Sequence, residues 1–100
     1  MEIHIPDAVG DFIENLPKED RSKIHASIDV LREDRIEELL IKKLKDKVKE
    51  IVVKQFRIIF FQIGSVAYIA DVYKKQSKKT PPRIIKRAEK IYKRATSIKK

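Results

Sequence analysis

The chain has 100 residues, of which 42% are hydrophobic and 39% are charged, and it carries a formal net charge of +9 and no cysteine. This length fits one domain with a single modest core, and the apolar content excludes wholesale disorder. The lack of cysteine excludes a disulfide framework and a thiolate metal site, and no apolar run reaches the roughly 18 residues that span a membrane. Two histidines far apart in sequence make a poor zinc site, so we expect no metal or cofactor. The lack of cysteine fits a reducing cytosol, and we expect a cytoplasmic protein.

The charge is divided unevenly along the chain. Residues 1–40 hold 5 Lys/Arg and 11 Asp/Glu, whereas residues 41–100 hold 19 Lys/Arg and 4 Asp/Glu. Such asymmetry indicates that the second half meets a polyanionic partner, and a phosphate backbone is the commonest one. A generically basic, lysine-rich surface, of the kind that thermophiles often carry, is the alternative.

The first 44 residues are predicted to form a short strand, two helices and an ambiguous connection. Residues 2–5 alternate as a short edge strand would. Apolar side chains recur at helical spacing over residues 7–16, and Pro17 separates this helix from a second one expected over residues 18–33. Residues 34–44, DRIEELLIKKL, fit either a short helix or an irregular connection.

From Lys47 onward the hydrophobic period changes from helix to strand. The segments KVKEIVV, QFRIIFFQI and SVAYIADVY predict three consecutive antiparallel strands. The TPP sequence at residues 80–82 predicts the start of a last helix, with Thr80 as the N-cap and Pro81 at the first helical position. We therefore predict one α+β domain over residues 1–100 in the order β-α-α-β-β-β-α. Its helical hairpin and C-terminal helix pack on one small antiparallel sheet.

Charged residues interrupt the apolar strands at Glu50, Arg57 and Asp71. Strict alternation places Arg57 on one face of its strand with Ile59, and Asp71 on one face of the next strand with Ile69. A charge on a mostly apolar strand must be paired or lie in a site. The sequence leaves open whether Arg57 pairs with Glu50, pairs with Asp71 or faces a ligand.

Several segments together resemble the RelE/ParE toxin superfamily, and most of all its HigB-like, phage-derived branch. The specific parts are FRIIFF and YKKQSKKTPP, supported by KKL before them and by IIKRAEKIYKR after them. The resemblance covers about residues 42–94, and the two expected N-terminal helices agree with the helical hairpin of the family. It implies the RelE-like fold and a bacterial or archaeal type II toxin, which is neutralised by a partner antitoxin protein. That partner is expected to carry acidic and apolar segments and a helix-turn-helix.

The resemblance also implies a reaction. RelE-like members cleave messenger RNA on the ribosome without a metal, through attack of a 2′-hydroxyl on the adjacent phosphate. This chemistry needs a base for the hydroxyl, cations for the phosphorane and an acid for the leaving oxygen. Matched to the family pattern, the catalytic candidates are Arg57, Tyr73, which stands where the family usually has Phe, and Lys75. The candidates for binding RNA or the ribosome are Lys43, Lys45, Lys47, Lys49, Lys74, Lys78 and Lys79.

One departure from the family pattern keeps other functions open. Glu50 matches the glutamate of the family's ElR motif, but Ile51, Val52 and Val53 occupy the region of its arginine. This favours a degenerate toxin that only binds an antitoxin. A ParE-like protein that poisons DNA gyrase would keep the fold and cleave no RNA, whereas the lysine cluster favours the nuclease. A small basic RNA-binding protein outside the family is disfavoured, because the strand aromatics are expected to be buried.

Overall fold

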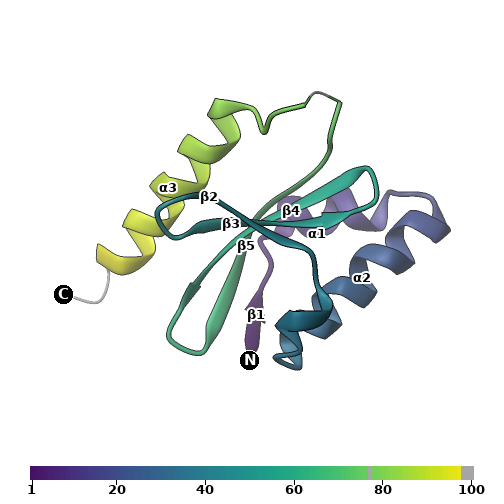
Figure 1. Ribbon diagram of the computed structural model, residues 1–100, viewed down its shortest axis with the longest axis horizontal. Helices are drawn as coiled ribbons and strands as arrows, with labels where there is room; N and C mark the ends of the chain where they lie inside the picture. Colours follow the sequence, from purple (N-terminus) through teal and green to yellow (C-terminus); the bar gives the residue numbers. More distant parts are fainter. Residues whose placement is uncertain (77, 98–100) are drawn as a thin grey trace.

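The computed structural model describes residues 1–76 and 78–97, and it consists of one sheet with helices on both faces (Figure 1). The α+β prediction is confirmed. The elements are β1 (Glu2–His4), α1 (Asp7–Glu14), α2 (Lys18–Arg32), the 3-10 helix η1 (Ile36–Glu38), β2 (Ile41–Lys45), β3 (Val48–Val53), β4 (Phe56–Ile63), β5 (Val66–Lys74) and α3 (Pro82–Ser97).

The sheet has five strands in the order β1-β5-β4-β3-β2. Strands β2 to β5 form an antiparallel meander, and β1 pairs in parallel with β5. The three predicted strands are therefore present, and β1 is an edge strand as expected. None of the helices in the described part of the chain is long and apolar enough to cross a membrane.

The ambiguous segment 34–44 contains a short 3-10 helix and then a strand, β2, which the sequence analysis did not predict. Ile41 packs on the core at one face of the sheet, whereas Leu44 packs on the core at the other face. The pairing with β3 shifts register between Lys43 and Lys45. That irregularity removes the simple alternation by which a strand is found in sequence.

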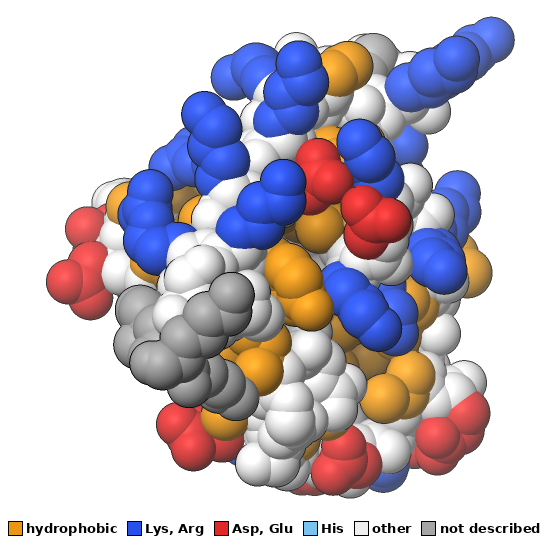
Figure 2. Space-filling model, turned by 90° about the vertical axis from the view of Figure 1, so that its left-hand side faces the viewer, with side chains coloured by type: hydrophobic (Ala, Val, Ile, Leu, Met, Phe, Trp, Pro, Cys, Tyr) orange, Lys and Arg blue, Asp and Glu red, His pale blue; other side chains and the backbone are white. Residues whose placement is uncertain are grey.

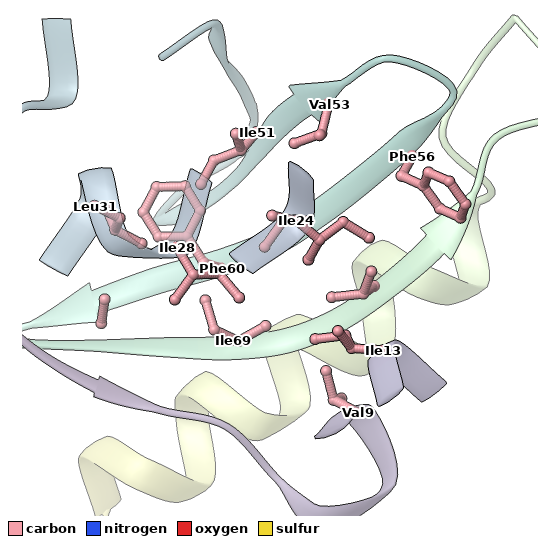
Figure 3. Close-up of a cluster of buried hydrophobic side chains, with 13 residues drawn as sticks. Val9, Ile13, Ile24, Ile28, Leu31, Ile51, Val53, Phe56, Phe60 and Ile69 are labelled. Carbon is pink, nitrogen blue, oxygen red and sulfur yellow. The ribbon is translucent and has the colours of Figure 1, made fainter. Parts of the chain in front are cut away.

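The larger core lies between the sheet and the N-terminal helices α1 and α2 (Figure 3). Apolar residues at helical spacing supply it from the helices, and alternate residues supply it from the strands. Phe60 and Ile69 are cross-strand partners at its centre. The helical members are Val9, Ile13, Ile24, Ile28 and Leu31.

The smaller core lies on the opposite face of the sheet, beneath α3. Ile84 and Ala88 of α3 pack on Val48, Ile59 and Phe61. The rings of Phe61, Tyr68 and Tyr92 meet here, with one stacked and one edge-to-face contact, both at 5.2 Å between centroids. The helices therefore cover both faces of the sheet. The first helical pair takes one face and α3 takes the other.

Strand β5 contains a bulge that changes which residues share a face. Phe60 pairs with Ile69 and Ile59 pairs with Asp71, so Ala70 is an additional residue in β5. A bulge lets two residues oppose one and restarts the alternation after it. The expectation that Asp71 shares a face with Ile69 is therefore wrong. Ile69 faces the α1/α2 core, whereas Asp71 and its neighbour Tyr73 lie on the α3 side.

Thr80 does not cap α3 as predicted. The helix begins at Pro82, one residue later than expected, and the carbonyl of Pro81 accepts the N–H of Ile84 at 3.0 Å. The hydroxyl of Thr80 instead donates to Oε1 of Glu50 at 2.8 Å. The Thr80 hydroxyl therefore bonds to the buried carboxylate of Glu50 in the sheet, although the sequence pattern predicted that it would cap the helix.

Candidate functional site

A cavity of about 400 Å³ lies between the end of β5 and the first turns of α3. The sheet supplies one wall and the helix the other, because the segment after β5 carries the chain back across the α3 side of the sheet. Its lining residues come from both elements and from the segment between them. They are Asp71, Tyr73, Lys74, Gln76, Pro81, Arg83, Ile84 and Arg87.

Positive charge dominates this cavity. Arg83 and Arg87 are four residues apart on α3, so they lie on one face of the helix, and Lys74 faces them from β5. Figure 2 shows Lys and Arg side chains gathered over α3. The sequence analysis did not identify the two arginines as site residues. Their signal was their place in the first two turns of the helix that follows TPP.

Asp71 is the carboxylate that lines the cavity. Its Oδ1 accepts the N–H of Val72 at 2.9 Å. Burial raises the pKa of Asp71 above its ordinary value, while the Val72 N–H and the guanidinium groups of Arg87 and Arg83 oppose this shift. In the sequence analysis Asp71 was only a possible ion-pair partner of Arg57.

Tyr73 contributes its side chain to the same wall. Its hydroxyl is buried and has no hydrogen-bond partner among the described residues. Burial raises the pKa of Tyr73, and the Glu50 and Asp71 carboxylates act in the same direction, against Thr80 and Arg57. The phenol therefore stays protonated at neutral pH and is unsuited to act as a base.

Arg57 is not among the described residues that line the cavity, and it contacts other groups of the protein. Its Nε is 4.0 Å from Oε2 of Glu50, and its Nη1 donates to the carbonyls of Lys54 and Phe56, both at 2.8 Å. The side chain is only 13% exposed. Of the alternatives left open by the sequence, the pairing with Glu50 is the one observed. Tyr73 is the cross-strand partner of Arg57, so the two catalytic candidates on strands are adjacent.

The lysines predicted to bind RNA, together with the catalytic candidate Lys75, fall into two groups. Lys74 lines the cavity, and the backbone N–H of Lys75 bonds to the carbonyl of Gln55 at 2.7 Å, which holds this segment beside the β3–β4 turn. Lys78 and Lys79 follow on the approach to α3, and both are exposed. These four lysines are close in sequence to residues that line the cavity.

The second group lies at the other end of β3, around the β2–β3 turn. Lys43 and Lys49 are cross-strand partners. The Nζ of Lys45 lies 3.7 Å from Oε2 of Glu89 in α3, and Lys47 is in the turn. The structure therefore does not bring this group together with the cavity. Within residues 1–76 and 78–97, no group of His, Cys, Asp and Glu side chains is arranged to hold a metal ion.

Comparison with known proteins agrees with this architecture. The family model of the Gp49-like phage-derived proteins matches residues 11–93. A RelE–RelB complex from Pyrococcus horikoshii OT3 contains a chain with a TM-score of 0.66 and 17% identity, over 78% of this chain and 97% of that one. A RelB–RelE antitoxin–toxin complex from Methanococcus jannaschii gives a TM-score of 0.61 and 18% identity, over 71% and 88%.

A search of curated proteins found no match to the chain. The two solved structures share the RelE fold with this chain. Because their sequence identities are only 17% and 18%, the similarity is evidence for the fold alone. The family match spans most of the sequence, including the β5 end and the start of α3 that form the cavity. The chain therefore belongs to the Gp49-like phage-derived protein family.

Proposed function

We propose that this protein is the toxin of a type II toxin–antitoxin system and that it cleaves messenger RNA on the ribosome. The observation that carries the proposal is the cationic cavity at the end of β5, where Arg83, Arg87 and Lys74 surround a space of about 400 Å³. A space of this kind accommodates a nucleotide and its phosphate, and the arginine fork suits a phosphate better than a lysine does. Such a toxin acts where ribosomes are, so we propose a cytoplasmic location.

In the proposed reaction the 2′-hydroxyl of one nucleotide attacks the adjacent phosphorus. The bond from phosphorus to the 5′-oxygen of the next nucleotide breaks, and a 2′,3′-cyclic phosphate remains. Arg83 and Arg87 neutralise the charge that develops on the phosphorane. Lys75 lies in the chain between Lys74 and Gln76, which both line the cavity. Its ammonium group gives a proton to the departing 5′-oxygen.

Arg57 and Tyr73 have supporting roles in this proposal. Arg57 is paired with Glu50, and the Tyr73 hydroxyl is buried, which supports a role for both groups within the protein. We assign Arg57 to holding the buried carboxylate and Tyr73 to forming the cavity wall with its ring. Lys43, Lys45, Lys47 and Lys49 would then contact the ribosome or more distant parts of the RNA.

The proposed partner is an antitoxin with acidic and apolar segments and a helix-turn-helix. Both RelE-like structures that resemble this chain were solved with RelB bound. An acidic segment would neutralise the lysines and arginines around the cavity, and this complementarity would also speed association. Phe12, Ile36 and Leu40 are exposed large apolar side chains that such a partner would cover.

The test is cleavage of ribosome-bound messenger RNA, mapped by primer extension. The variant Arg83→Gln/Arg87→Gln should lose activity by at least about 10²–10³-fold, the usual loss for one transition-state donor. The matched control is Lys86→Gln/Lys90→Gln, which changes the same charge at the same spacing on α3 but lies outside the cavity lining. The control should retain nearly full activity.

Three results would contradict the proposal. Equal losses in both variants would mean that the charge of α3 matters and the cavity does not. A wild-type protein that binds an antitoxin and ribosomes but leaves the message intact would favour the degenerate toxin. Inhibition of DNA supercoiling by purified gyrase, without RNA cleavage, would favour a ParE-like target.

A further inference from the structure

The bulge in β5 determines where the carboxylate of Asp71 lies. Ala70 and Asp71 both stand opposite Ile59, so the strand alternation restarts at this point. Asp71 consequently lies on the α3 side of the sheet and lines the cavity instead of joining the α1/α2 core. Bulges often re-aim a side chain next to an active site.

Asp71 is not committed to a structural ion pair. Within the described part of the chain, Arg57 forms its ion pair with Glu50, and none of the ion pairs within 4.0 Å includes Asp71. One oxygen of Asp71 accepts the N–H of the adjacent Val72. The carboxylate therefore keeps the capacity to accept a proton from a molecule in the cavity.

Among the described residues that line the cavity, Asp71 alone can act as a base at neutral pH. Lys74, Arg83 and Arg87 are cations, and Tyr73 keeps its proton because its pKa is raised. Gln76 has no proton-accepting group of suitable strength. The reaction proposed above requires a base for the 2′-hydroxyl, and these residues offer one candidate.

We propose that Asp71 is the general base that takes the proton of the attacking 2′-hydroxyl. This inference rests on the proposed function. The proton passes from the 2′-oxygen to the carboxylate, the 2′-oxygen forms a bond to phosphorus, and the bond to the 5′-oxygen breaks. The 5′-oxygen takes a proton from Lys75. Exchange with water then returns Asp71 and Lys75 to their starting states, so the step needs no further reactant.

The surroundings of Asp71 suit this role. Burial raises its pKa toward the pH at which the enzyme works, which makes the carboxylate a stronger base than an exposed aspartate. The groups that face it are Arg83 and Arg87 from α3 and Tyr73 from its own strand. The arginines hold the carboxylate ionised and would bind the phosphate next to the nucleophile.

The test is single-turnover cleavage of ribosome-bound message by Asp71→Asn across a pH range. The rate constant should fall by about 10²–10⁴-fold. The acid limb of the wild-type profile, which rises with pH as Asp71 loses its proton, should disappear. RNA binding should stay the same or tighten, because a negative charge has left a cationic cavity. A merely structural role would not combine a lost acid limb with retained binding.

The matched control is Glu89→Gln, which removes a carboxylate from the basic surface of α3 outside the cavity lining. It should retain the wild-type rate and pH profile. Melting temperatures of all proteins check folding, and Asp71→Glu provides a second variant, which should recover part of the activity. An Asp71→Asn protein that cleaves at the wild-type rate would overturn the assignment of Asp71 and leave the proposed function standing. A wild-type protein that cleaves nothing would overturn both.

Discussion

At the scale of single residues, the least expected feature is a carboxylate inside the sheet. Glu50 is 1% exposed and lies on the α3 side of β3. Removing a charge from water is costly unless it is paired and hydrogen-bonded. Arg57 at 4.0 Å and the Thr80 hydroxyl at 2.8 Å meet that requirement together. Glu50 therefore joins β3, β4 and the approach to α3 at one buried point.

Arg57→Ala should destabilise the fold. The change leaves Glu50 buried with only the Thr80 hydroxyl as a partner, and breaking one side of a buried pair costs about 3–5 kcal/mol. Denaturant unfolding measures the loss. The double variant Glu50→Gln/Arg57→Met should lose less than Arg57→Ala, because it leaves no unpaired charge. A fully stable but inactive Arg57→Ala protein would instead return Arg57 to a direct role at the phosphate.

At the scale of elements, the segment between β5 and α3 is fixed at both ends by interactions with the sheet. The Lys75 N–H bonds to the Gln55 carbonyl at 2.7 Å, and Thr80 bonds to Glu50 at 2.8 Å. Between these two points lies much of the lysine cluster that the sequence analysis singled out. The Thr80 contact also sets where Pro82 begins α3, and hence where Arg83 stands.

Thr80→Val should loosen this segment without removing core packing. Hydrogen bonds to charged groups contribute about 1.5–3 kcal/mol, so tryptic cleavage in the lysine cluster should become about tenfold faster or more. Thr80→Ser keeps the hydroxyl and should restore the wild-type rate. Mass spectrometry of the limited digest locates the cuts. Unchanged cleavage in Thr80→Val would show that the Glu50 contact does not restrain the segment.

Much of the element pattern was predictable because it follows from hydrophobic period and turn residues. The helical hairpin, the three long strands and the last helix each follow such a pattern. Strand β2 and the β5 bulge were not predictable, because both break the alternation by which strands are recognised. The cavity was predicted only in part. The lysines after Tyr73 indicated the region of the chain where the cavity lies. The walls of the cavity depend on the β5 bulge and on the position in which α3 packs on the sheet.

At the scale of the whole molecule, charge and architecture coincide. Residues 1–40, with 5 Lys/Arg and 11 Asp/Glu, include both helices on one side of the sheet. The helix on the other side, α3, lies in the segment with 19 Lys/Arg and 4 Asp/Glu. The protein therefore presents a basic side and an acidic side. A polyanion would attract the first, repel the second and so orient the molecule before contact.

This orientation predicts a specific salt dependence. Lys74→Gln/Lys75→Gln should weaken ribosome or RNA binding and lower the slope of log K against log salt by about 1.4, because each phosphate contact with a single strand contributes about 0.7. Lys18→Gln/Lys23→Gln on α2 is the matched control, with the same charge change on the opposite side of the sheet. Its slope should stay near that of the wild type. Equal slopes for the two variants would contradict a directed binding face.

The additional residue in β5 has a consequence for relatives of this protein. Because Ala70 is one extra residue, odd-numbered positions of β5 face the α1/α2 core before it and face α3 after it. A relative that lacks this one residue would pair regularly here and would keep Val72 in the core and Asp71 and Tyr73 on the α3 side. A relative that keeps the residue but loses the bulge would turn over every later residue of the strand, so Val72 would meet α3 while Asp71 and Tyr73 met the opposite face. In a comparison of such chains, a one-residue gap at Ala70 would therefore leave the cavity wall unchanged, whereas a straightened strand of the same length would lose it.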